Sequence, residues 1–215
     1  IHPLKRINSF DRAMQWLHEC QPRLAEDIES KRGLLQDFMF LRHFSHGCKK
    51  VFSGARWAMT GESGVFLDPF YSPGGDFIAI ANTYITELIA LDRARQPVAS
   101  YARIYEQFFM SFYESTMSLY RDQYRMFGDP EVLPVKVLWD YTYYWGVLCQ
   151  LFFQRRLTDL PMLSRLRDEL QGSKALNFAM QDFLREWSSH SRRGNRPMIL
   201  DHASLEWLPG LNPGL

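Results

Sequence analysis

Residues 57–76 read WAMTGESGVFLDPFYSPGGD, and this stretch says more about the fold than any other part of the chain. A short apolar strand runs into Gly61-Glu62. A tight loop follows around Asp68-Pro69 and Gly74-Gly75, and a helix is expected from Phe77 to about Arg95. The first amides of a helix have no partner within it, and the helix dipole adds partial positive charge there. The order of strand, acid, glycine loop and helix therefore predicts a binding site for an anionic ligand.

The same stretch resembles a known flavin-binding motif. In FAD-dependent monooxygenases of the tryptophan halogenase-like branch, the second flavin motif reads Gly-Asp-Ala, an apolar pair, Asp-Pro, and a small-residue loop that opens a long helix. The matching residues here are Gly61-Glu62-Ser63, Phe66-Leu67, Asp68-Pro69 and Ser72-Pro73-Gly74-Gly75. The chain is thus similar to the carboxy-terminal part of such a protein, with the specific resemblance confined to residues 38–95.

The resemblance implies that the protein binds FAD, and it assigns roles within the motif. In the family, the acid after the first glycine contacts the ribityl chain, which makes Glu62 the expected contact. The loop and helix start face the flavin edge that becomes negative on reduction, where backbone amides would stabilise the charge. The implied cofactor-binding residues are Gly61, Glu62, Asp68, Pro69, Gly74, Gly75 and Asp76, and those lining the flavin face toward the substrate are Phe70, Tyr71 and Ser72.

Three positions depart from the halogenase pattern. Glu62 replaces the usual Asp and extends the carboxylate by one methylene. Tyr71 stands where tryptophan halogenases carry an acid, and Pro73 stands where a backbone N–H commonly holds the halide, which proline cannot supply. The Trp-x-Trp-x-Ile-Pro signature of halogenases does not occur in the sequence either. These departures leave the flavin expectation intact and weaken the expectation of halogenation.

The first motif of the superfamily does not occur in this sequence. No Gly-x-Gly-x-x-Gly triplet, which would bind the ADP half of FAD, occurs in the 215 residues. The sequence also opens at Ile1, without an initiator methionine. We therefore expect a carboxy-terminal piece of a two-part FAD-binding fold, whose partner is an amino-terminal dinucleotide-binding segment.

Composition limits the other classes of function. Apolar residues make up 46% of the chain, and 25 basic against 24 acidic residues give a net charge of +1. This balance argues against nucleic-acid binding, which requires a basic excess. No apolar run approaches the ~18 residues of a membrane span. Cys20, Cys48 and Cys149 form no C-x-x-C pair, which favours a reducing, cytoplasmic location over a disulfide framework.

The amino-terminal part of the chain is predicted to combine short helices and strands. Ser9 can cap a first helix, and Pro22 can start a second one. Residues 34–50 are predicted to form one or two strands. A hairpin turn at 53–56 and a strand at 57–60 then lead into the flavin-type motif.

Beyond Gln96-Pro97 the pattern becomes wholly helical. The expected helices cover residues 98–127, 134–156, 161–170 and 173–188. The predicted fold class is therefore mainly α with a small β portion, that is, α+β. We divide the chain into a flavin-edge portion, residues 1–96, and a helical carboxy-terminal domain, residues 97–215.

Aromatic side chains recur at helical spacing in two of these predicted helices. They could line a pocket for an aromatic or polyene substrate, or they could form the core, as aromatic residues commonly do. Packing is the favoured role for any single residue, although their density exceeds what packing needs. The carboxylate pairs Glu114/Asp122 and Asp182/Glu186 are expected to face solvent rather than to bind metals.

Two further groups of polar residues are candidates for a metal site and for a contact with an anionic partner. His43, His46 and Cys48 carry zinc-ligating side chains, but alternation along a strand would point the two histidines to opposite faces. We therefore expect no metal site. The basic group Arg192-Arg193 with Arg196 could meet an anionic partner or carrier protein, with a solvated loop as the favoured reading.

Together these observations predict an FAD-dependent oxidoreductase resembling flavin-dependent halogenases and aromatic monooxygenases. Its substrate would be a small molecule, free or bound to a carrier. The resemblance implies that reduced flavin activates oxygen for hydroxylation, epoxidation or halide oxidation. Two alternatives stay open: a dehydrogenase or reductase of the same superfamily acting on polyene or prenyl chains, and a non-catalytic helical binding module.

Overall fold

The computed structural model describes residues 7–41 and 44–191, and the chain divides into two compact units, Ile1–His46 and Gly47–Leu215. The second unit contains both the flavin-type loop and the helices after residue 97. The functional division at residues 96 and 97 therefore stays a prediction.

Two short helices make up most of the first unit. α1 (Phe10–Cys20) begins after Ser9, whose side-chain oxygen accepts a hydrogen bond from the amide of Arg12. α2 (Pro22–Ser30) has proline at its first position, where an N–H would lack an intrahelical partner in any case. A 3₁₀ turn, η2 (Arg32–Leu34), follows. Both helix starts confirm the predictions from the sequence.

The strands predicted over residues 34–50 are not formed. The described residues of this segment, 34–41 and 44–50, contain no β-strand. Alternation favours a strand only when it buries one face of the chain. Here it buries none, since Leu34, Met39 and Leu41 are 78%, 73% and 52% exposed.

A small antiparallel hairpin lies near the start of the second unit. β1 (Phe52–Ser53) pairs with β2 (Trp57–Ala58), which confirms the predicted turn but shortens the predicted strand. The carboxylate of Glu106, on α4, accepts hydrogen bonds from the amides of Val51 and Phe52 at 2.7–2.9 Å. A helix side chain thus satisfies amides that a longer sheet would have paired.

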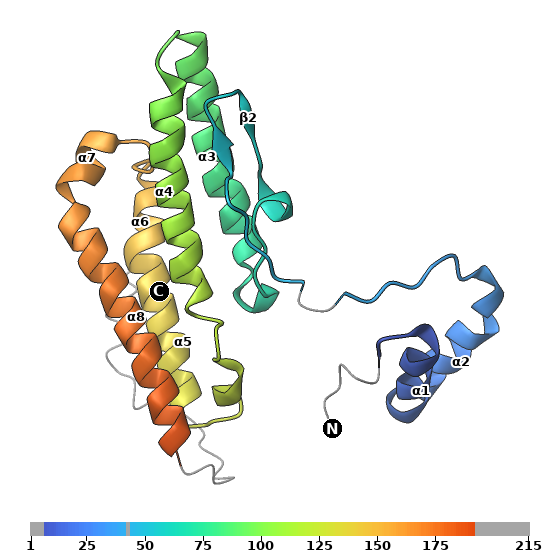
Figure 1. Ribbon diagram of the computed structural model, residues 1–215. Coiled ribbons are helices and arrows are strands. Elements are labelled where there is room, and N and C mark those ends of the chain that lie inside the picture. The colour runs from blue at the N-terminus through green and yellow to red at the C-terminus, as the bar shows by residue number, and fades with distance from the viewer. Residues whose placement is uncertain (1–6, 42–43, 192–215) are drawn as a thin grey trace. The chain divides into compact units, whose positions relative to one another are not determined.

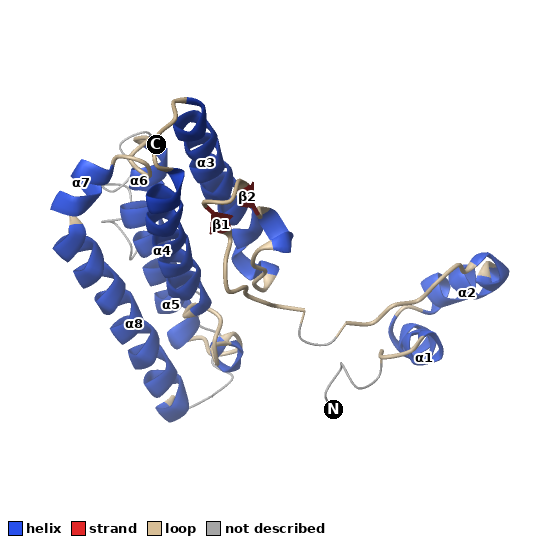
Figure 2. Ribbon diagram, turned by 45° about the horizontal axis from the view of Figure 1, so that its top comes forward, coloured by secondary structure: helices blue, strands red, loops and turns tan. Residues whose placement is uncertain are grey.

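The body of the second unit is a helical bundle whose long segments run alternately up and down in Figure 1. α3 (Pro73–Arg93) packs against α4 (Val98–Met117), and Figure 2 shows the hairpin beside them. The remaining elements are the 3₁₀ turn η5 (Tyr124–Met126), α5 (Val132–Tyr143), a π-helical turn η6 (Tyr144–Cys149), α6 (Gln150–Phe153), α7 (Leu160–Arg165) and α8 (Arg167–His190). The fold class predicted from the sequence, mainly α with a small β portion, is confirmed.

The aromatic stripe predicted along residues 98–127 contributes much of the core. Tyr105 and Phe109 of α4 are each 1% exposed. The ring of Tyr105 stacks on Tyr84 of α3 with 4.6 Å between centroids, and Phe109 meets both Phe77 and Phe52. Burial of one such side chain stabilises the fold by about 1.5–3 kcal/mol. These rings join the hairpin, α3 and α4 into one core.

Two helices start earlier than the sequence predicts. α3 begins at Pro73 rather than Phe77, because proline is favoured at the first helical position, and Gly74 and Gly75 therefore belong to its first turn. α8 begins at Arg167 and runs through Gly172 without a break. Packing of α8 against α4 and α5 outweighs the ~1 kcal/mol that a glycine costs within a helix.

One helix ends earlier than predicted. α4 stops at Met117 instead of Phe127. The hydroxyl of Ser118 donates to the carbonyl oxygen of Ser115 at 2.7 Å, and Asp122 adopts a left-handed conformation with φ of 57°. Such side-chain bonds to the backbone compete with helix continuation. Within the described part of the chain, no helix combines the length and the hydrophobicity needed to cross a membrane.

Candidate functional site

The loop that resembles the flavin motif is shaped by two 3₁₀ turns that pack on α3. η3 (Gly61–Ser63) and η4 (Pro69–Tyr71) both contact this helix. The Asp68 carboxylate accepts a hydrogen bond from the amide of Phe70 at 3.1 Å and so fixes the second turn. Ser72 then adopts a left-handed conformation with φ of 55° immediately before α3 begins. Asp68 and Pro69 thus lie at the start of this turn, and their role in binding a flavin stays a prediction.

The amino terminus of α3 is where the sequence predicts an anionic ligand to bind. Its first turn contains Pro73, Gly74 and Gly75, and helix geometry leaves the last two amides without intrahelical partners. A Cβ added at either glycine would meet nothing within 4 Å. This chain therefore has two amides without intrahelical partners at the positive end of a 21-residue helix, at glycines whose Cα atoms face open space.

Glu62 lies on η3, farther along α3 than the glycine turn. Its residue is exposed, and neighbouring Gly61 has a positive φ of 62°. Thr60, just before the turn, donates from its hydroxyl to the side-chain oxygen of Asn82 on α3 at 3.0 Å. The structure thus holds η3 on the helix with Glu62 accessible. Its contact with a ribityl chain remains a prediction.

The three residues expected to line the substrate side of the flavin lie differently from one another. Phe70 is 48% exposed and stacks on Phe127 with 4.5 Å between centroids. Ser72 is also exposed. Tyr71 instead turns inward and lines a cavity between the helices. The loop therefore presents Phe70 and Ser72 to solvent and Tyr71 to the interior.

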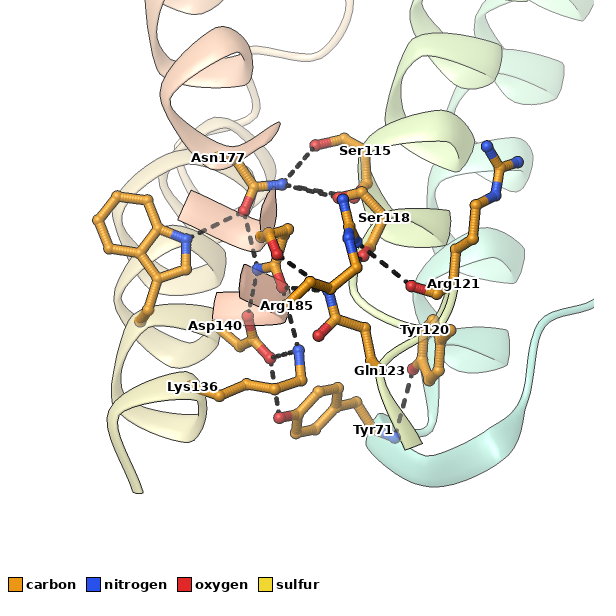
Figure 3. Close-up of polar contacts among 12 residues, drawn as sticks. Tyr71, Ser115, Ser118, Tyr120, Arg121, Gln123, Lys136, Asp140, Asn177 and Arg185 are labelled. Atoms are coloured by element: carbon orange, nitrogen blue, oxygen red, sulfur yellow. Dashed lines mark hydrogen bonds and ion pairs between the residues drawn. The ribbon is translucent and has the colours of Figure 1, made fainter. Parts of the chain in front are cut away.

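A buried polar network holds Tyr71 against the helices, as Figure 3 shows. The Tyr71 hydroxyl donates to Oδ2 of Asp140 at 2.9 Å, and its amide donates to the hydroxyl oxygen of Tyr120 at 3.3 Å. Lys136 Nζ lies 2.7 Å from the same Oδ2. Gln181 Nε2 donates to Oδ1 of Asp140 at 2.7 Å. Asp140 thus accepts from three side chains on different elements.

The charged pair at the centre of this network is almost fully buried. The side chains of Lys136 and Asp140 are 0% and 2% exposed. Loss of hydration lowers the pKa of Lys136, and the adjacent carboxylate acts in the opposite direction. Burial, followed by the charge of Asp140, raises the pKa of Tyr71, so this hydroxyl stays protonated and serves as a donor.

The network continues from α8 to α4 and α5. Gln123 Nε2 donates to Oε1 of Gln181 at 3.1 Å. One turn earlier on α8, Asn177 Nδ2 lies 3.3 Å from the hydroxyl oxygen of Ser115, and the amide oxygen of Asn177 accepts from the indole N–H of Trp139 at 3.1 Å. Oε1 of Gln123 has no hydrogen-bond partner among the described residues, whereas Asp140, Asn177 and Gln181 are each bonded through both side-chain polar atoms. The bonds that are formed favour one arrangement of the helices around the loop.

The cavity beside Tyr71 has a volume of about 700 Å³, within the range of small-molecule sites. Its walls are mostly apolar and come from α3, α4, α5, the π-helical turn, α7 and α8. Both Pro73 and Asp76 of the first turn of α3 line it. The aromatic and aliphatic side chains that line it include Tyr84, Phe108, Phe112, Tyr141, Tyr143, Tyr144, Leu148 and Leu160. Some residues of the two aromatic stripes thus form a pocket, and others form the core.

Asp76 is a second carboxylate at the motif end of this cavity. The hydroxyl of Tyr144, in the π-helical turn, donates to its Oδ1 at 3.0 Å. Burial raises the pKa of Asp76, and the hydrogen bond from Tyr144 opposes that shift. A π-helical turn shifts the face that a helix presents, and such turns are frequent at functional sites. Here the turn brings Tyr144 to Asp76.

Lys136 and Asp140 were not selected as site residues from the sequence. They lie four residues apart in the segment VLPVKVLWDYTY, whose other side chains are apolar, aromatic or hydroxyl-bearing. Two opposite charges one helical turn apart in such a segment indicate a buried ion pair. That signal was available from the sequence. Their partner Tyr71 could not have been deduced, because it lies about 70 positions away in the chain.

Most residues of the predicted metal cluster and of the basic group lie outside the part of the chain that the structure describes. His43, Arg192, Arg193 and Arg196 lie outside the described residues. Within the described residues, no group of three His, Cys, Asp or Glu side chains could hold a metal ion. The pair Glu114 and Asp122 is exposed, as are Asp182 and Glu186, in line with solvent-facing charges.

Comparison with known proteins adds one distant relative. The chain is 23% identical over 203 residues to the flavin-dependent halogenase chlA of Dictyostelium discoideum. This chain is similar to a flavin-dependent halogenase. The match covers 89% of the chain and 33% of that protein, so the chain spans about a third of the length of the curated relative it matches. No protein-family profile and no solved structure matches. The predicted resemblance to this group is thereby confirmed.

Proposed function

We propose that this chain is the carboxy-terminal part of an FAD-dependent oxidoreductase of the monooxygenase and halogenase type. FAD would supply the redox chemistry and oxygen activation. Glu62 would bind the ribityl chain, and Gly61 and Asp68-Pro69 would hold the loop that faces the cofactor. The amides of Gly74, Gly75 and Asp76 would lie at the flavin edge. The missing dinucleotide-binding half would come from an amino-terminal segment.

One juxtaposition supports this proposal above the others. The open amides at the start of α3 and the cavity of about 700 Å³ share the same first turn, because Pro73 and Asp76 line the cavity while Gly74 and Gly75 leave open space. A cofactor on the amides would therefore lie beside a substrate in the cavity. This placement is what a bimolecular reaction requires, since positioning supplies much of the rate enhancement.

The residues of the chain would bind the substrate, shield it from water and orient it toward the cofactor. The apolar walls would exclude water from the substrate, which strengthens electrostatic interactions inside the site. Tyr71 and Asp76 would contact the substrate at the motif end, and Lys136 would hold the Asp140 side chain in place through their ion pair. The flavin-edge portion up to residue 96 and the helical domain from residue 97 would build this site jointly.

The reaction type within this class depends on halide binding. Pro73 supplies no N–H, which weakens a halide site at the first position of α3. The structure nevertheless leaves the Gly74 and Gly75 amides at the same helix end, and the relative is named a halogenase. Product analysis with reduced FAD, oxygen and either chloride or bromide would separate halogenation from hydroxylation or epoxidation.

The experiment that tests the flavin site is a charge substitution at the helix start. Gly75→Asp would place a carboxylate beside the open amides, where a Cβ meets nothing within 4 Å. In the complete protein, we expect at least a tenfold loss of FAD affinity, measured by absorbance and equilibrium binding, with the fold retained. Gly172→Asp is the matched control, because Gly172 is also helical with nothing within 4 Å of an added Cβ. Equal FAD affinity in both variants would refute the site.

The other readings predict different outcomes in the same experiment. A dehydrogenase or reductase acting on polyene or prenyl chains would also bind FAD, and it would turn over without forming an oxygenated or halogenated product. A non-catalytic helical module would bind no flavin in its complete form.

The proposal includes a reducing, cytoplasmic location, which the free state of Cys20, Cys48 and Cys149 supports.

A further inference from the structure

The hydrogen-bonding capacity of Tyr71 is restricted by its partner. A tyrosine hydroxyl has one proton to donate and lone pairs that accept. The proton of Tyr71 goes to Oδ2 of Asp140, the same oxygen that forms the ion pair with Lys136. Toward the cavity, the Tyr71 oxygen can therefore only accept a hydrogen bond. A molecule that meets it there has to offer an O–H or N–H group.

The length of the cavity follows from the positions of two residues along α8. Gln181, which binds Asp140, marks the level of Tyr71, and Arg167 at the start of the helix also lines the cavity. The two residues are 14 positions apart in one uninterrupted helix, which corresponds to about 21 Å at 1.5 Å per residue. Figure 1 shows that α3 and α8 begin at opposite ends of the bundle. Because Tyr71 just before α3 and Arg167 at the start of α8 both line the cavity, the cavity extends along the bundle axis between them.

The end of the cavity near α7 and α8 carries positive charge. Arg167 and Lys174 are the described basic residues that line the cavity, whereas its lining carboxylates, Asp76 and Asp140, belong to the motif end. Lys174 is paired with Glu114 at 2.9 Å. Arg167 forms no ion pair with a described residue. An anionic group on a ligand is the partner that this end lacks.

We propose that the substrate is an elongated amphiphile with an O–H or N–H donor at the Tyr71 end, an apolar body, and an anionic group at the Arg167 end. The inference rests on the proposed function, because it takes the cavity as the substrate site. The anion is either a carboxylate of a free substrate or a phosphate on the arm of a carrier, and both would pair with the same arginine.

The test is direct binding to the 215-residue chain, which contains every residue of the cavity lining. The probe is 8-(4-hydroxyphenyl)octanoic acid, measured by calorimetry beside its methyl ether, which has no donor, and its methyl ester, which has no charge. We expect the ether to bind about three- to tenfold more weakly, the loss of one hydrogen bond. The ester should bind about two- to fivefold more weakly, since Arg167 is exposed.

Two variants assign these preferences to their residues. Tyr71→Phe should abolish the preference for the hydroxyl over the ether and leave the preference for acid over ester, and Arg167→Gln should do the reverse. Tyr101→Phe and Arg165→Gln are matched controls outside the cavity lining and should change neither preference. Replacing the carboxylate by a phosphate monoester distinguishes the two sources of the anion: tighter binding favours the carrier arm, and weaker binding favours a free acid.

The proposal is overturned if the probe does not bind, if ether and ester bind as well as the parent acid, or if the preferences survive in the two variants. The ligand pairs are compared in the unaltered chain, so the test does not depend on a variant folding. None of these measurements involves flavin. A complete protein without FAD would refute the proposed function and leave the binding result standing.

Discussion

The ammonium nitrogen of Lys136 lies 2.7 Å from a carboxylate oxygen of Asp140, with both side chains buried in the helical bundle. The same oxygen accepts the hydroxyl of Tyr71 from the loop that resembles a flavin motif. One ion pair thus links the fold of the bundle to the position of the loop. Removal of the ion pair should lower the stability of the bundle, and the loop should lose its fixed position as a consequence.

Lys136→Met should destabilise the fold strongly. The substitution keeps most of the side-chain volume but leaves Asp140 buried without its cation, a change that typically costs about 3–5 kcal/mol. Urea denaturation followed by circular dichroism measures the loss. Lys31→Met is the control, because Lys31 and Asp27 form an ion pair at 59% and 57% exposure, whose loss should cost less than ~1 kcal/mol. Similar losses in both variants would contradict the account of the buried pair.

Asp76→Asn should stabilise the protein at neutral pH. Burial raises the pKa of Asp76, so ionisation is less favourable in the folded chain than in the unfolded one. The stability of the natural protein therefore falls as pH rises through the folded pKa, whereas asparagine does not ionise. The two proteins should converge as pH falls below the ordinary value of 3.8. Free energies of unfolding measured from pH 3 to pH 7 test this; a gap that widens toward low pH would show the opposite sign.

Local chemistry was readable from the sequence wherever a single residue decides the outcome. Ser9 as a cap, Pro22 as a helix start, and the turn before Trp57 follow from side-chain geometry that acts over three or four residues. The flavin-type loop is identified differently, by its resemblance to the motif of a known family. These features need no knowledge of what packs against them.

Features that depend on distant contacts could not be read in this way. Residues 34–50 alternate like a strand, yet no core covers one face. α8 passes through Gly172 because its neighbours support it. The inward turn of Tyr71 depends on Asp140 and Tyr120, far along the chain. The cavity likewise arises from the side chains of several helices, so the sequence indicated aromatic density without separating pocket from core.

Gly61→Ala should destabilise the loop. Gly61 has a φ of 62°, and an added Cβ would lie 3.3 Å from Cγ1 of Ile78. The left-handed conformation costs an L-residue about 1–2 kcal/mol, before any steric adjustment. Gly172→Ala provides the contrast, since it lies in α8 with open space and should stabilise by about 0.5–1 kcal/mol. Thermal unfolding of both variants measures the difference in sign.

Glu62→Ala in the complete protein should weaken FAD binding without affecting the fold. Glu62 is exposed on η3, and substitutions at exposed positions usually change the free energy of unfolding by no more than about 0.5 kcal/mol. Loss of a charge-assisted hydrogen bond to a ribityl hydroxyl would cost about 1.5–3 kcal/mol of binding energy. Fluorescence titration with FAD measures the change, and Glu169→Ala, an exposed glutamate on α8, is the control. Unchanged affinity would place the ribityl contact elsewhere.

The 215-residue chain by itself should bind FAD weakly, with a dissociation constant above the micromolar range. The sequence has no Gly-x-Gly-x-x-Gly turn to hold the pyrophosphate and adenosine. Among the described residues, the proposed contacts to FAD are the amides of Gly74, Gly75 and Asp76 and the side chain of Glu62. A few hydrogen bonds of about 1–3 kcal/mol each cannot supply the ~8 kcal/mol of micromolar binding once the loss of ligand freedom is included. Calorimetry with FAD and with riboflavin, which lacks the ADP half, tests this directly. Both ligands should bind with similar weak affinity, and a strong preference for FAD would reveal an adenosine or pyrophosphate site within this chain.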